Sequence, residues 1–319
     1  MLTADLPPPD GGAKMRPLRG ELVDIGGRRL RAVRAGQGLD GPLVVLECGA
    51  FGCAADWAVV QERLAAAGLR SLAYDRAGLG YSDAGPMPRD GAAILSDLTE
   101  LLTALGERGP YVLCGHSMGG LFVRLFALKR PDDVLGVVLV DAVTPEVLDR
   151  RMLAAGVHAY RRAMRVVGAG AKIGFMRPMS LFIGDMIGLA GEASTEKRRI
   201  YGDRVHTRWA AEEVQRWPAT SVQARDAGVF DPDLPVAVVT AGAVAPGKRL
   251  KAIQSAPALA SRHGYIDHVP GSNHASLLGL RFADPVVKGV EHVLKAAVAL
   301  GRHPLGSRGT APQAASSRS

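Results

Sequence analysis

Cysteine is scarce in this chain, and neither disulfides nor a secretion signal are expected in it. Its 319 residues include only three cysteines, too few for the disulfide framework of a secreted domain, so a reducing, cytoplasmic location is expected. Residues 1–19 contain no apolar run of the kind found in signal peptides and are predicted to form a flexible arm. Residues 301–319 are rich in Ser, Arg, Gly and Ala, a composition that predicts a disordered tail.

Motifs for binding metals, phosphates and nucleic acids are missing as well. The sequence has no metal-ligand cluster, and Gly78-Leu79-Gly80 lacks the third glycine of a dinucleotide-binding turn, so neither a metal nor a cofactor is expected. The net charge of +8 is concentrated between Arg150 and Arg208, where 12 Lys and Arg accompany 4 Asp and Glu. Without a nucleic-acid motif, this segment indicates either a solvated helical face or a basic surface for weak, peripheral contact with an anionic membrane.

Strand-like and helix-like segments alternate through most of the remaining chain. Residues 20–144 and 228–300 are predicted to form an α/β core, a mostly parallel sheet with helices on both faces, because apolar strands and helical stretches follow each other there. Residues 145–227 show helical patterns without a convincing strand. They predict a helical lid inserted between two strands at the carboxyl edge of the sheet, where ligands bind in open α/β folds.

An apolar, Met-rich run from Ile173 to Gly191 lies within the predicted lid. Arg177, Pro178 and Asp185 interrupt it, which argues against a membrane span. The run indicates either a packed lid core or a wall around an apolar substrate, since flexible thioether side chains adapt to different shapes.

A Gly-x-Ser-x-Gly motif, formed by Gly115, Ser117 and Gly119, joins an apolar strand to a helical stretch. This strand–turn–helix context is typical of a nucleophile elbow. The turn is so tight that residues two positions from the serine must be nearly free of side chain. It lifts the Ser117 hydroxyl above the sheet and points the backbone N–H of Met118 toward developing negative charge.

A serine hydroxyl is a poor nucleophile at neutral pH and needs a base within hydrogen-bond reach. Of the eight histidines, His274 lies in a small-residue loop after the last predicted strand and is the predicted base. His268 is expected inside that strand with a structural hydrogen bond. His116, beside the serine, is interpreted as part of the elbow that can line the site.

Three motifs together resemble the α/β-hydrolase fold superfamily: the elbow, Asp75–Ser82 and Leu46–Ala50. The resemblance extends over about residues 20–300 and is weakest in the lid. It implies a serine hydrolase with a triad and an oxyanion hole, whose acid usually follows the first strand after the lid. Here that acid is missing, because no Asp or Glu occurs between residues 234 and 266.

Asp141 is predicted to replace the missing acid. It ends the strand after the elbow helix, and some members of the superfamily place their acid at this position. Two alternatives remain open: Asp141 caps the turn at Thr144, or Asp267 serves as the acid. The resemblance also places a second oxyanion donor at the backbone N–H of Ala50, with Phe51 next.

Two buried pairs are predicted near these motifs. Glu47 ends an apolar strand, and a buried carboxylate needs a partner, for which Arg76 is the natural choice. Cys48 and Cys114 are expected on neighbouring strands as packing groups and not as a redox pair.

The sequence therefore predicts a serine hydrolase that cleaves an ester-type bond of an apolar small molecule through a covalent acyl-enzyme. A serine at the elbow argues against epoxide-hydrolase and dehalogenase chemistry, for which the resemblance implies aspartate. Peptidase, thioesterase, lactonase, haloperoxidase-like and lyase activities stay open, since a fold does not determine a substrate. A small-molecule binding protein with slow or no turnover is the alternative outside enzymology. The oligomeric state is not predicted.

Overall fold

The computed structural model describes residues 17, 19–149, 151–171, 178, 180–181, 186–243 and 249–302. Most of the predicted arm, most of the predicted tail and much of the Met-rich run therefore lie outside the described residues.

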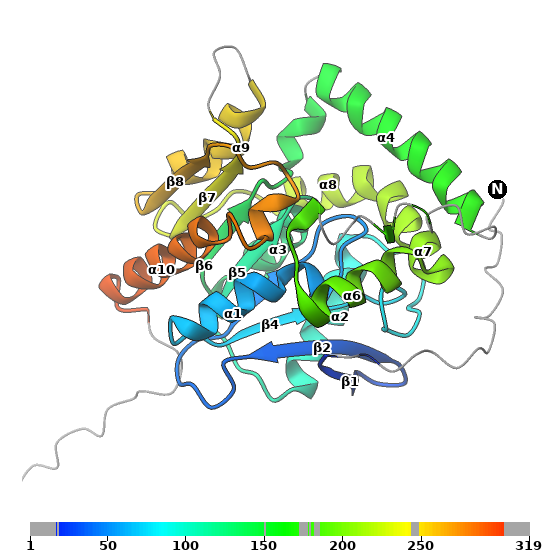
Figure 1. Ribbon diagram of the computed structural model, residues 1–319. Coiled ribbons are helices and arrows are strands. Elements are labelled where there is room, and N and C mark those ends of the chain that lie inside the picture. Colours follow the sequence, from blue (N-terminus) through cyan, green and yellow to red (C-terminus); the bar gives the residue numbers. More distant parts are fainter. Residues whose placement is uncertain are drawn as a thin grey trace, which may run out of the picture.

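Eight strands form one sheet in the order β1-β2-β4-β3-β5-β6-β7-β8 (Figure 1). The strands are β1 (Glu21–Asp24), β2 (Arg29–Ala35), β3 (Val44–Glu47), β4 (Ser71–Tyr74), β5 (Tyr111–His116), β6 (Val134–Val140), β7 (Val236–Ala241) and β8 (Gly264–Val269). Strand β2 pairs antiparallel with both β1 and β4, and the other neighbouring strands pair in parallel. The predicted mostly parallel sheet is confirmed.

Helices cover both faces of the sheet, and this explains why its strands read as continuous apolar runs. Helices α1 (Ala58–Ala66) and α10 (Asp284–Ala299) pack on one face, against one set of alternating strand side chains. Helices α2 (Gly91–Ala104), α3 (Gly119–Lys129) and α9 (Arg249–Ala260) pack against the other set. The parallel strands β3, β5, β6 and β7 all direct their carboxyl ends to the same edge, which is where their loops meet.

Residues 145–227, here called the cap segment, join β6 to β7. Their described part contains helices and no strand: η3 (Pro145–Asp149), α4 (Arg151–Gly170), α6 (Gly191–Tyr201), α7 (Arg204–Gln215) and α8 (Trp217–Asp226). Figure 1 shows these helices in green, gathered beside the sheet. Helix α7 packs on α4, and α8 packs on α2 and α3 of the core. Within the described ranges, no helix is both long and apolar enough to cross a bilayer.

Two local features differ from what the sequence suggests. Helix α9 was not predicted, because its apolar residues are mostly alanines and Pro257 stands inside it. Asp56 precedes a helical stretch but does not cap it, because α1 begins at Ala58 with Trp57 as its N-cap. Asp56 instead lies in the short 3-10 helix η1 (Ala54–Trp57) and accepts a hydrogen bond from Lys197 of the cap segment. A long-range partner thus decides its role.

Candidate active site

The turn between β5 and α3 has the steric requirements of a nucleophile elbow. Ser117 adopts a left-handed backbone conformation with φ of 55°. A Cβ atom on Gly115 would lie 2.7 Å from the carbonyl oxygen of Gly119, and one on Gly119 would lie 2.6 Å from that of Glu47. Both contacts are with backbone that cannot move aside easily. Glycine is therefore required on both sides of the serine.

Backbone strain is concentrated at this edge of the sheet. In the part of the chain that the structure describes, the non-glycine residues with positive φ are Phe51 at 56°, Ser117 at 55° and Asp141 at 41°. They follow β3, β5 and β6, three neighbouring strands of the sheet. Such conformations are unfavourable for residues with a Cβ and tend to persist where a site needs them. The strain marks the loops that carry the predicted site residues.

Asp141 and His274 are in direct contact. His274 Nδ1 lies 2.6 Å from Asp141 Oδ2, and the other carboxylate oxygen accepts from Ala241 N at 3.3 Å and from Gln254 Nε2 at 3.2 Å. Burial by itself raises the pKa of Asp141. The hydrogen bonds to the carboxylate, of which the one from His274 has the largest effect, outweigh burial and hold the pKa below its usual range. Asp141 is therefore an ionised carboxylate that can orient the His274 ring.

The neighbouring histidine, His116, ties the His274 loop to the elbow. Its Nε2 lies 3.0 Å from the carbonyl oxygen of His274, and the two rings are 4.6 Å apart between centroids. Burial, with a smaller contribution from His274, lowers the pKa of His116 to about 3, so its ring is neutral at pH 7. Because a carbonyl oxygen only accepts, Nε2 of His116 must carry the ring proton and donate.

Ser117 is the residue next to His116, yet its hydroxyl makes no hydrogen bond to His274 among the described residues. Catalytic hydrogen bonds of this kind are often long in the absence of substrate and shorten in the reactive complex. The structure thus places Asp141 and His274 in hydrogen-bond contact, and the His116 ring contacts the His274 backbone. The hydrogen bond between His274 and the Ser117 hydroxyl is not formed.

Two backbone N–H groups are available beside the serine. Neither Ala50 N nor Met118 N donates to an acceptor in the described part of the chain. The Gly49 carbonyl oxygen, which shares a peptide unit with Ala50 N, accepts from Arg76 Nη2 at 3.0 Å. In a trans peptide the C=O and N–H point in opposite directions, so this bond turns Ala50 N–H away from Arg76.

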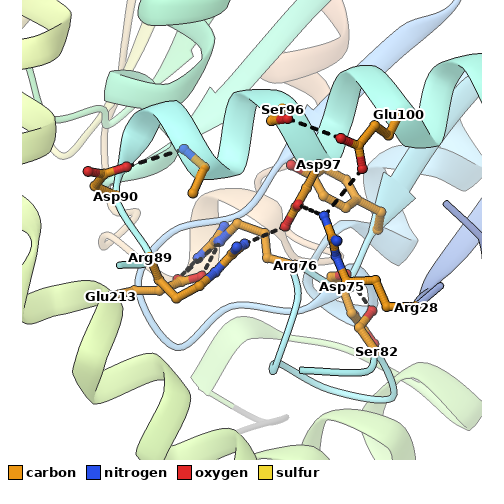
Figure 2. A network of polar contacts seen from close by, with 12 residues as sticks. Arg28, Asp75, Arg76, Ser82, Arg89, Asp90, Ser96, Asp97, Glu100 and Glu213 are labelled. Atoms are coloured by element: carbon orange, nitrogen blue, oxygen red, sulfur yellow. Dashed lines mark hydrogen bonds and ion pairs between the residues drawn. The ribbon is translucent and has the colours of Figure 1, made fainter. Parts of the chain in front are cut away.

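The predicted pair of Glu47 and Arg76 is confirmed, with a distance of 2.6 Å between Glu47 Oε1 and Arg76 Nη1. A second carboxylate was not anticipated: Glu213 of α7 receives Arg76 Nη2 at 2.7 Å (Figure 2). Burial lowers the pKa of Arg76, but Glu213 and Glu47 outweigh burial and keep it well above its usual value. Glu213 was missed because it lies in the cap segment, 137 residues from its partner.

The remaining predicted residues have structural surroundings. His268 Nδ1 lies 2.6 Å from Thr240 Oγ1, which confirms the expected structural hydrogen bond. Asp267 accepts from the Tyr265 hydroxyl at 3.4 Å, whereas His274 is bonded to Asp141.

The cysteines Cys48, Cys53 and Cys114 are free and buried, as expected of Cys48 and Cys114 as packing groups. Burial raises the pKa of each thiol, so all three stay protonated at neutral pH. Within the described ranges, no group of three or more His, Cys, Asp or Glu side chains could hold a metal ion.

Comparison with known proteins agrees with this architecture. A family profile described as the alpha/beta hydrolase fold matches residues 42–169. An uncharacterized protein of Schizosaccharomyces pombe is 30% identical over 185 residues, which are 54% of this chain and 31% of the relative. The chain therefore matches only about a third of that relative's length.

Solved structures share the fold at low sequence identity. A proposed epoxide hydrolase from Pseudomonas aeruginosa superimposes with a TM-score of 0.67 and 20% identity, over 87% of this chain and 96% of that one. A thermophilic esterase from Thermogutta terrifontis gives 0.61 and 19%, over 85% and 94%. The chain has the α/β-hydrolase fold, and its residues 42–169 match the family profile of that name.

Proposed function

We propose that the protein is a serine hydrolase that cleaves an ester-type bond of an apolar small molecule. The observation that carries this proposal is the 2.6 Å hydrogen bond between Asp141 and His274, formed at the sheet edge where Ser117 stands in a strained elbow. A carboxylate, an imidazole and a serine hydroxyl at one edge are the groups needed for nucleophilic acyl transfer.

In the proposed reaction, the Ser117 oxygen attacks the substrate carbonyl carbon, and His274 Nε2 takes the hydroxyl proton. The carbonyl oxygen becomes an oxyanion that the N–H groups of Met118 and Ala50 stabilise. His274 then protonates the leaving alcohol, and an acyl-enzyme remains. Water, deprotonated by His274, attacks this ester, and the acid is released as Ser117 recovers its proton. Asp141 accepts a hydrogen bond from Nδ1–H of His274 throughout, which leaves Nε2 to take the proton and return it, and the carboxylate stabilises the imidazolium that forms.

Apolar surroundings support the choice of substrate. Ala50 and Met118 pack in an apolar cluster with the buried side chains of Leu121 and Phe122 and the half-buried side chain of Trp217. A second apolar cluster joins Ala50 to the cap helices α4 and α7. An apolar acyl chain would gain about 0.8 kcal/mol for each CH₂ group buried against such surfaces. The similarity to an epoxide hydrolase concerns the fold, and the elbow of this chain carries a serine.

Covalent labelling by a fluorophosphonate tests the proposal most directly. We expect one equivalent of label on Ser117 in the wild-type protein and none in Ser117→Ala, since only an activated serine attacks phosphorus. Initial rates on p-nitrophenyl esters of increasing acyl length should rise from acetate toward longer chains. A folded wild-type protein that is neither labelled nor active would contradict the proposal and favour a binding protein.

A further inference from the structure

A buried lysine of the cap segment reaches the loop that follows β3. Lys197 lies on α6, its side chain is 3% exposed, and its Nζ donates to Phe51 O at 3.1 Å and to Asp56 Oδ2 at 3.0 Å. Burial lowers the pKa of Lys197, but Asp56 outweighs burial and keeps it above its usual value, so the ammonium is charged. Although Lys197 belongs to the basic segment 150–208, it is therefore not part of a solvated face.

The loop that Lys197 contacts is a strained turn. Gly52 N donates to Gly49 O at 3.2 Å, which places Ala50 and Phe51 at the two central positions. Phe51 has φ of 56°, a conformation that favours glycine. A charge-assisted hydrogen bond to the Phe51 carbonyl is stronger than a neutral one and can offset this strain. The same turn carries Ala50 N, the proposed oxyanion donor.

Arg76 supports the other end of the turn. It donates to Cys48 O at 2.8 Å and to Gly49 O at 3.0 Å, and Glu213 of α7 balances its charge. Three carbonyl groups of the loop thus face two buried cations. Lys197 belongs to the cap segment, and Arg76 is paired with Glu213 of the cap segment. The Phe51 side chain also packs among apolar residues of α4 and α7.

We infer that Lys197 is a positioning residue for the oxyanion hole. It holds the turn at Ala50 and Phe51 in its active shape and makes that shape dependent on the docked cap segment. This inference rests on the proposed function. Its consequence is specific, because a displaced oxyanion donor weakens binding of the transition state more than binding of the substrate. Loss of Lys197 should therefore lower kcat and leave KM nearly unchanged.

Two variants separate positioning from charge pairing. Asp56→Asn leaves Lys197 able to donate to Phe51 O, but it removes the partner charge of a buried ammonium, so stability should fall while kcat is kept. Lys197→Met/Asp56→Asn removes both charges and leaves no unpaired buried ion, so stability should recover while the donor to Phe51 is lost. The adjacent Glu196 still binds Arg31 Nη2 at 2.5 Å, which keeps α6 docked in both variants.

For Lys197→Met/Asp56→Asn we expect kcat on p-nitrophenyl esters to fall by about 10- to 100-fold with KM little changed, since losing an oxyanion donor costs about 10²- to 10³-fold. Fluorophosphonate labelling should slow by a similar factor. Deuterium should also exchange faster at Gly52 N–H, a readout that does not depend on activity. A double variant with wild-type kcat and wild-type exchange would overturn the inference. A wild-type protein without activity or labelling would instead overturn the proposed function.

Discussion

Asp141→Asn tests the proposed triad with almost no change in shape. Asp141 Oδ1 already accepts from Ala241 N and Gln254 Nε2, at 3.3 and 3.2 Å. Because both partners are donors, the introduced amide would keep its carbonyl oxygen on that side and turn its NH₂ group toward His274. Nδ1 of His274 would then have to accept a hydrogen bond, which moves the ring proton to Nε2.

An imidazole with its proton on Nε2 cannot take the proton of Ser117. The same substitution in Ser-His-Asp proteases lowers kcat about 10⁴-fold for this reason, equivalent to about 5 kcal/mol of transition-state stabilisation. We expect a loss of about 10³- to 10⁴-fold here, with the fold intact. The unfolding free energy should change by only ~1 kcal/mol, because the hydrogen bonds from Ala241 N and Gln254 Nε2 are retained and the one to His274 is reversed in direction.

Steady-state hydrolysis of p-nitrophenyl butyrate would measure kcat, and urea unfolding would measure stability. Asp267→Asn is the matched control, because its carboxylate contacts the Tyr265 hydroxyl and should leave kcat close to wild type. The reasoning would be refuted if Asp141→Asn kept more than about a tenth of the wild-type kcat, or if Asp267→Asn lost as much activity as Asp141→Asn.

The other predictions concern stability. Burial lowers the pKa of both His116 and His206 to about 3, while an unfolded chain protonates them near 6.5. The unfolded state therefore binds more protons between these values, and the unfolding free energy should fall by about 2.7 kcal/mol per pH unit below pH 6.5. Urea unfolding at pH 7, 6 and 5 measures this slope, which His206→Gln should halve; equal stability at pH 7 and 5 would contradict it. Gly119→Ala should destabilise by at least ~1–3 kcal/mol, because its Cβ would meet Glu47 O at 2.6 Å, whereas Gly156→Ala meets nothing within 4 Å and should be neutral or stabilising. Equal unfolding midpoints for the two alanine variants would show that the elbow tolerates a side chain.

Local patterns were enough to predict most of the sheet and the residues of the candidate site. Both faces of the parallel strands are buried, so they appear in the sequence as apolar runs. The elbow can be identified in the sequence because its tight turn requires glycine at positions 115 and 119. Because no Asp or Glu occurs between residues 234 and 266, the sequence favoured Asp141 as the acid, and the structure places Asp141 in contact with His274. The catalytic role of these residues remains a prediction.

What the sequence determined by itself depends on neighbours along the chain: the order of strands and helices, the elbow, and the loop that carries His274. Only the tertiary structure decided which residues from distant parts of the chain contact the site loops and hold them in place. Lys197 stands in a run of basic residues that resembles a solvated face, yet it is buried against Asp56 and Phe51, which are more than 140 residues away. Glu213 and Gln254 likewise have unremarkable local sequence and act through Arg76 and Asp141. From the sequence one can infer only that a buried charge or amide needs a partner. The packing of the cap segment and of α9 on the core determines which partner it meets.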